Sequence, residues 1–250
     1  MNFILFSILI LLLLPLAFKF IFIRQNPIST KNIVIFYSIS FVLPLVIPYP
    51  WIEKITLDYF AGLGPAFLST TLILLLELFL AFLLSWLLSQ RLPLEHFTPT
   101  NFFLFPLLGL GFGLGKMLRD ILLVYYHPLS SFYGYSQFAN FPTTSFLIQK
   151  LLQAQIETIA FGILGIAFLR MTQVQKRNPF IFFLLALGIK ELENLARLLP
   201  QFVPSLAFLS AVYLISLLPL TLIIGLAILW FLYQREKRSD QLLSNNQSSS

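Results

Sequence analysis

The sequence contains no cysteine, so disulfide bonds and thiolate metal sites are excluded. It also has few charged residues, which make up 10% of its 250 positions, and its two histidines are His96 and His127. Soluble domains usually carry about 25% charged residues. The scarcity of charge therefore argues against a soluble domain. The formal net charge of +6 does not indicate nucleic-acid binding, because membrane topology explains the basic residues.

Hydrophobic residues are abundant, at 58% of the chain, with a mean hydropathy of +0.87. A membrane-spanning helix needs about 20 mainly apolar residues. We therefore expect an all-α membrane protein, a bundle of seven transmembrane helices that forms one domain over residues 1–236. Residues 237–250 are polar and are expected to form a disordered cytoplasmic tail. The seven expected spans are Phe3–Ile23, Asn32–Trp51, Gly62–Leu88, Phe102–Tyr126, Phe146–Arg170, Pro179–Leu199 and Leu206–Tyr233.

The basic residues between these spans predict how the chain is oriented. Lys31, Arg91, Lys176 and Arg238 follow the first, third, fifth and seventh spans, whereas the loop around His127 has neither lysine nor arginine. Loops on the cytoplasmic side carry an excess of basic residues. We therefore expect a multi-pass protein of the cell membrane, with its N-terminus outside and its C-terminus in the cytoplasm.

Nine of the charged residues within the expected spans are candidates for an internal polar cluster. Each would cost about 2.5–3.5 kcal/mol if it faced lipid at the centre of the bilayer. They must therefore pair with one another inside the bundle or line a wet cavity, and any function is to be sought there. The nine are Glu77, Lys116, Arg119, Asp120, Glu157, Lys190, Glu191, Glu193 and Arg197.

Helical spacing predicts how some of these charges are arranged. Lys190, Glu193 and Arg197 share one helix face, and Glu191 points about a quarter-turn away. Lys116 and Asp120 are four residues apart and are expected to pair, which leaves Arg119 in need of an acid from elsewhere.

The depth of the charges predicts a further pair. We expect Glu157 within ion-pair distance of Lys190, Lys116 or Arg119, because opposite charges share one depth. Two interpretations remain open: a polar cluster that fixes helix register, and a site for chemistry, binding or transport.

Four glycines alternate along the fourth expected span. Gly109 and Gly113 form one G-x-x-x-G pair, and Gly111 and Gly115 form another. Such pairs allow close approach of another helix, so we expect these glycines to face neighbouring helices. The run does not match the glycine patterns of nucleotide-binding loops.

The chain resembles the PrsW family of intramembrane metalloproteases, relatives of the CAAX-protease-like superfamily. Residues 109–112 reproduce the family's G-L-G-F stretch, after a span that holds Glu77. Residues 161–165 resemble the next motif, and residues 190–194 fall where a final H-x-x-x-[DN] motif is expected, with Asn194 matching its last position. The resemblance covers about residues 1–200 and implies an intramembrane hydrolase scaffold.

The metal-site positions of that family are mostly replaced. Leu76 precedes Glu77 where the family has a second acid, Lys116 replaces a glutamate, and Glu157 and Lys190 stand where histidines are expected. His96 and His127 lie on connections on opposite sides of the expected bundle and cannot share one metal. The resemblance therefore implies a scaffold that has lost its usual metal and kept a charged core.

Three functions follow as alternatives. The first is a PrsW-like protein without a metal site that binds a membrane-protein partner or a ligand through its charged core. The second is an active protease with altered ligands, in which Glu77, Glu157, Glu193 and Asn194 are the candidate catalytic residues and a divalent cation such as zinc would be needed. The third is a transporter that uses the charges as an ion or proton path. All three place the chain in a lipid bilayer and none involves nucleic acid.

Overall fold

The computed structural model describes residues 30–46, 63–91, 99–125, 143–172, 180–202 and 218–247. Each of these ranges forms one α-helix, so the described part of the chain is entirely helical, as the composition predicts. The expected first span, Phe3–Ile23, lies outside the described residues. The helices are α2 (Thr30–Val46), α4 (Leu63–Arg91), α5 (Pro99–Tyr125), α7 (Thr143–Thr172), α8 (Phe180–Phe202) and α10 (Leu218–Gln247).

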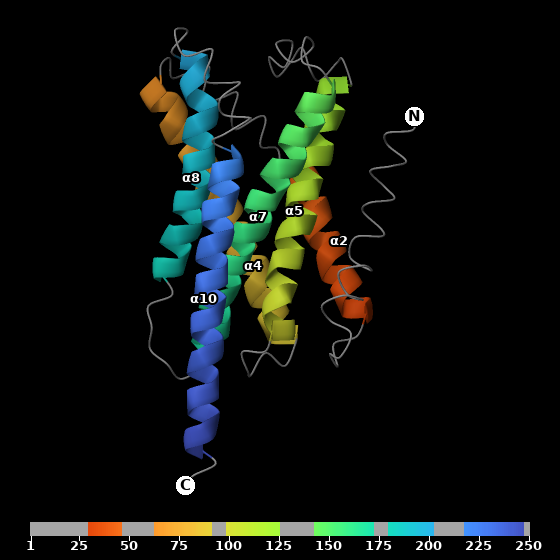
Figure 1. Cartoon of the computed structure of the whole chain (residues 1–250). Coiled ribbons are helices and arrows are strands. Elements are labelled where there is room, and N and C mark those ends of the chain that lie inside the picture. Colours follow the sequence, from red (N-terminus) through yellow and green to blue (C-terminus); the bar gives the residue numbers. More distant parts are fainter. Residues whose placement is uncertain are drawn as a thin grey trace.

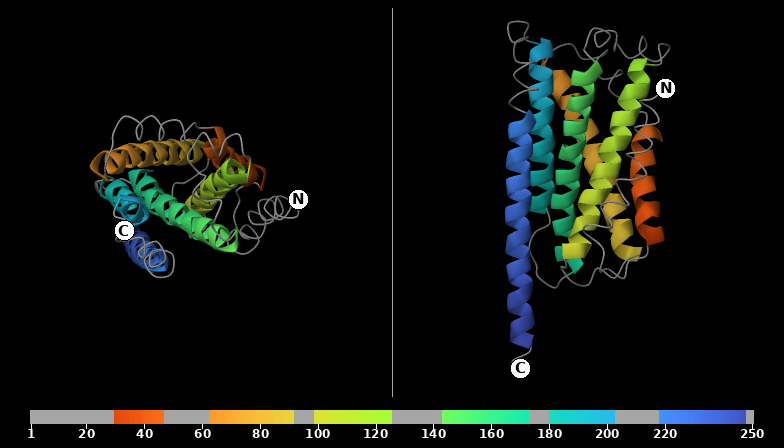
Figure 2. Two further views of the ribbon diagram at one scale, coloured as in Figure 1. Left: turned by 90° about the horizontal axis from the view of Figure 1, so that it is seen from above. Right: turned by 45° about the vertical axis from the view of Figure 1, so that its right-hand side comes forward.

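The six helices run alternately up and down along one common direction (Figure 1). α5 and α7 form the best-packed pair, with α2 on the far side of α5 and with α8 and α10 against α7 (Figure 2). α4 packs mainly on α8 and less on α7, whereas α4 and α5 are not among the well-packed pairs of described helices. Charged side chains of α4, α5, α7 and α8 meet between these four helices.

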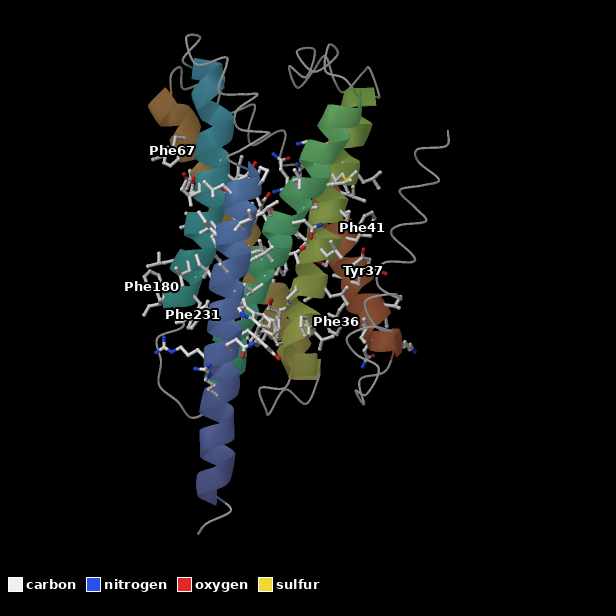
Figure 3. All side chains as sticks on the ribbon, in the orientation of Figure 1. Phe36, Tyr37, Phe41, Phe67, Phe180 and Phe231 are labelled. Carbon is white, nitrogen blue, oxygen red and sulfur yellow. The ribbon has the colours of Figure 1, made fainter. Side chains whose placement is uncertain are left out.

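Three helices carry stretches long and apolar enough to cross a membrane: Thr70–Leu87, Phe102–Asp120 and Lys150–Phe168. α2 and α10 contain shorter apolar stretches, Lys31–Val46 and Pro219–Arg235. Large apolar side chains also cover the outer faces, as Figure 3 illustrates with Phe180 and Phe231 on α8 and α10. The described structure is therefore that of a helical bundle with the character of a membrane protein.

The alternating glycines of α5 allow this helix to pack closely between α7 and α2. An added Cβ at Gly113 would lie 2.6 Å from the Cα of Ala154, and one at Gly109 would collide with the backbone of Glu157, both on α7. Gly111 and Gly115 instead face α2, where a Cβ would meet Tyr37 and Phe41. The two G-x-x-x-G pairs thus face two different helices, and the backbone of α5 approaches both closely.

The C-terminal helix departs from the expectation of a disordered tail. α10 continues to Gln247 and projects beyond the ends of the other helices (Figure 1). The stretch after Tyr233 is polar, but it is rich in glutamine, glutamate, lysine, arginine and leucine, which favour helix, and it has neither glycine nor proline. A polar composition therefore marked the end of the apolar stretch but not the end of the helix.

Candidate functional site: a charged cavity between four helices

Four helices each contribute one charged side chain to a closed set of ion pairs, which we call the tetrad: Glu77 of α4, Lys116 of α5, Glu157 of α7 and Lys190 of α8. Lys116 Nζ lies 2.9 Å from a carboxylate oxygen of Glu77 and 2.8 Å from one of Glu157. Lys190 Nζ lies 2.6 Å from Glu77 and 2.9 Å from Glu157. Each ammonium therefore donates to both carboxylates, and the formal charges of the tetrad cancel.

Three of the four tetrad side chains are almost fully removed from solvent. The exposed fractions are 3% for Glu77, 5% for Glu157 and 3% for Lys190, against 24% for Lys116. Buried charges are tolerated when they are paired and hydrogen-bonded, and the tetrad meets this requirement for both acids. The prediction that Glu157 pairs with at least one of Lys190, Lys116 and Arg119 is confirmed, and its partners are the two lysines.

Aromatic side chains close one end of the tetrad. Phe112 lies one turn from Lys116 and its ring centroid is 5.5 Å from that of Phe161, which lies one turn from Glu157. The ring of Phe112 faces Lys190 Nζ at 6.0 Å. Further along the same direction the rings of Phe105 and Phe168 stack at 6.4 Å. On the side of the tetrad away from Lys150, the described part of the bundle is therefore packed with apolar rings.

A second cluster, the triad, lies on the side of the tetrad away from these aromatic rings. It consists of Arg119, Asp120 and Lys150. Arg119 donates from Nε and Nη2 to Asp120 Oδ1, at 3.0 and 2.8 Å. Lys150 Nζ lies 2.7 Å from Asp120 Oδ2. The predicted pair between Lys116 and Asp120 is wrong, because other cations already bind both oxygens of Asp120 and Lys116 turns toward the two glutamates.

The remaining predicted residues lie around these clusters. Glu193 Oε1 accepts a hydrogen bond from Gln153 Nε2 at 2.7 Å. Asn194 donates from Nδ2 to Thr70 Oγ1 at 2.8 Å and to Glu191 Oε2 at 3.3 Å. Asn194 thereby ties α8 to α4 beside the tetrad.

The side chain of Arg197 lies outside what the structure describes. Its predicted place on one face with Lys190 and Glu193 therefore stays a prediction.

A cavity of about 90 Å³ lies between the four helices. One water molecule needs on the order of 10–15 Å³, so the cavity is large enough for several water molecules or a small polar group. Its lining combines the tetrad, the triad and the candidate catalytic residues Glu193 and Asn194, together with Gly113 and several apolar side chains. The structure thus brings most of the predicted site residues to one internal space.

Three residues of this site were missed by the sequence analysis, although helical spacing points to each. Lys150 lies seven residues before Glu157 and Gln153 four residues before it, so both share its face of α7. Thr70 stands in the same relation to Glu77 on α4, seven residues earlier. A search for polar residues four and seven positions before each charged residue would have found all three.

The geometry does not favour a metal centre. Among the residues that the structure describes, no three histidine, cysteine, aspartate or glutamate side chains converge to hold a metal ion. The two acids that share the tetrad are each held by two ammonium groups, which occupy the positions that a cation would need. His96 and His127 lie outside the described residues.

Comparisons with protein-family models, with curated proteins and with solved structures find no match for this chain. The site is therefore interpreted from its own geometry and from the general chemistry of charged groups in membranes.

Proposed function

We propose that this chain is a seven-span membrane protein on a PrsW-like scaffold that binds a polar ligand, or a polar segment of a membrane partner, in its charged cavity without hydrolysing it. The observation that carries the proposal is the pairing of both tetrad glutamates with both tetrad lysines beside a cavity. A hydrolase of the resembling kind needs metal ligands that are free to bind a cation, and here lysines hold the carboxylates.

The proposed topology places the N-terminus outside and the C-terminus in the cytoplasm. The six described helices alternate in direction (Figure 1), and the basic residues after the odd-numbered spans set which side is cytoplasmic. The triad end of the cavity would face outward in this arrangement. Reporter fusions after Arg177 and Arg238 should read cytoplasmic, and a fusion near His127 should read external; the opposite pattern would contradict the orientation.

Binding is favoured over transport because most buried polar side chains of the described helices lie on one side of the aromatic rings, around the cavity. Beyond the aromatic rings that close the tetrad, the buried side chains of the described helices that carry a polar atom are few and include Ser40, Ser85 and Tyr233. Ser40 donates to the carbonyl of Leu108 at 2.6 Å and thereby bonds α2 to α5. An ion path needs polar groups along its whole length, and the described core on that side is mainly apolar.

The proposal is tested by native mass spectrometry of the purified full chain in mild detergent. Ile73 lines the cavity from α4, whereas its neighbour Leu72 is exposed on the outer face. The Ile73→Trp variant should fill the cavity and lose a bound mass that the wild type retains. The matched Leu72→Trp variant should keep that mass, because its new ring faces away from the bundle.

Metal analysis of the same preparation separates binding from hydrolysis. The proposal expects zinc well below one ion per chain, and no change in bound ligand after treatment with a chelator. One zinc per chain that is lost in the Glu157→Gln variant would contradict the proposal and revive the active-protease interpretation.

A further inference from the structure

The charged side chains that line the cavity differ in how much of their surface is exposed. The three acids of the tetrad and triad are nearly sealed, with exposed fractions of 3% for Glu77, 5% for Glu157 and 8% for Asp120. Three cations are more exposed than any of these acids: 24% for Lys116, 15% for Arg119 and 14% for Lys150. Glu193, the other acid that lines the cavity, is half-buried, so the accessible charged groups of the cavity are three cations and one acid.

The three exposed cations come from two helices that are held at a fixed distance. Lys116 and Arg119 lie within one turn of α5, and Lys150 lies on α7, the helix that α5 packs against most closely. Asp120 lies between Arg119 and Lys150 and binds both. Its charge offsets one of the two, so the triad keeps a formal charge of +1. Glu193 of α8 also lines the cavity, and its carboxylate accepts a hydrogen bond from Gln153.

We propose that the cavity binds an anionic phosphate or carboxylate group between Lys116, Arg119 and Lys150. This inference rests on the proposed ligand-binding function and names the ligand's chemistry. Arginine and lysine form charge-assisted hydrogen bonds with such groups, and these bonds are roughly twice as strong as neutral ones. The guanidinium of Arg119 supplies a planar set of donors, while the two ammonium groups act as point charges.

The triad lies toward one end of the expected spans. Arg119 and Asp120 are seven and six residues before the end of the expected span Phe102–Tyr126, and Lys150 is four residues after the start of Phe146–Arg170. At about 1.5 Å of rise per residue, all three lie within roughly 10 Å of that end. Long basic side chains this near the end of a span extend toward the interface, where a free phosphate and the phosphate of a lipid headgroup are both found.

The experiment measures binding to the purified full chain in a neutral maltoside detergent at constant ionic strength. One arm titrates inorganic phosphate, and a second titrates a short-chain phosphatidylglycerol, with the zwitterionic phosphatidylcholine of equal chain length as its control. Saturable binding of phosphate identifies a free anion, and binding of phosphatidylglycerol alone identifies a lipid headgroup. Either result supports the proposal, and an absence of saturable binding in both arms overturns it.

Two substitutions of the triad are expected to act in opposite directions. Lys150→Gln removes one charge-assisted hydrogen bond and should weaken anion binding about tenfold. Asp120→Asn removes the acid that competes for Arg119 and Lys150, so it should tighten binding several-fold. Arg235→Gln, at an exposed basic position on α10, is the matched control and should leave the affinity unchanged.

The opposite signs separate a binding role from a structural one. If the triad only stabilised the fold, both substitutions would lower the melting temperature and neither would change the affinity for the anion, which overturns the proposal. Should Asp120→Asn fail to fold, the Lys150→Gln titration alone decides, because unchanged affinity there is also contradictory.

The outcome also distinguishes this inference from the proposed function. A bound mass that is lost in Ile73→Trp but is not an anion would overturn the anion inference and leave the ligand-binding function standing. If the Ile73→Trp variant keeps both the bound mass and the affinity for phosphate, the ligand-binding function and the anion inference are both overturned.

Discussion

The tetrad and the triad line the same cavity, yet they differ in how many helices they join and how completely they exclude water. The tetrad joins four helices, and three of its side chains are at most 5% exposed. The triad joins two helices, and both of its cations are about 15% exposed. Ion pairs that are fully removed from water are costly to break, whereas partly exposed ones contribute little. From this comparison we expect the three sealed side chains of the tetrad to stabilise the bundle, and the triad together with the more exposed Lys116 to contact a ligand.

Breaking the tetrad should have the largest effect. Glu157→Gln removes one acid and leaves two buried lysines with Glu77 alone, which should lower the free energy of unfolding by about 3–5 kcal/mol. Adding Lys190→Met removes the surplus charge and should recover part of the loss. Unfolding in mixtures of maltoside and dodecyl sulfate, followed by helical circular dichroism, measures both. Strictly additive effects of the two substitutions would contradict the paired tetrad.

Separating α5 from α7 should have the next largest effect, because this pair carries members of both clusters. Gly113 lines the cavity between them and faces the backbone of Ala154. Gly113→Leu should overpack this contact and cost about 1–3 kcal/mol. Gly188→Leu is the control, because an added Cβ there meets nothing within 4 Å. Equal melting temperatures for the two variants would mean that the helices adjust freely.

Much of the helical framework could be predicted from the sequence, because apolar length sets where helices form. The expected span Phe146–Arg170 falls within α7, and Phe102–Tyr126 nearly coincides with α5. The end of α10 could not be predicted from hydropathy, because a polar helix outside the bundle has no apolar signal. The sequence also indicates which helices carry charge, since unpaired charges in lipid are costly.

The partners within the site were harder to predict than its members. Residues four apart on one helix can pair, and this rule predicted a contact between Lys116 and Asp120. The actual partners depend on how α4, α7 and α8 are rotated around α5, and one sequence does not specify these rotations. Lys150 was missed for a different reason: it lies near the start of its span and was not considered with the interior charges.

Removing one cation from the triad should have the smallest effect on stability. This prediction tests the difference between the tetrad and the triad most directly. Lys150→Gln makes a change of the same kind as Glu157→Gln, a charged side chain replaced by an amide. Asp120 keeps its two hydrogen bonds from Arg119 after the change, so no buried charge is left bare. We therefore expect a loss below about 1 kcal/mol in the same unfolding assay. A loss as large as that of Glu157→Gln would show that both clusters stabilise the bundle and that the triad is not reserved for a ligand.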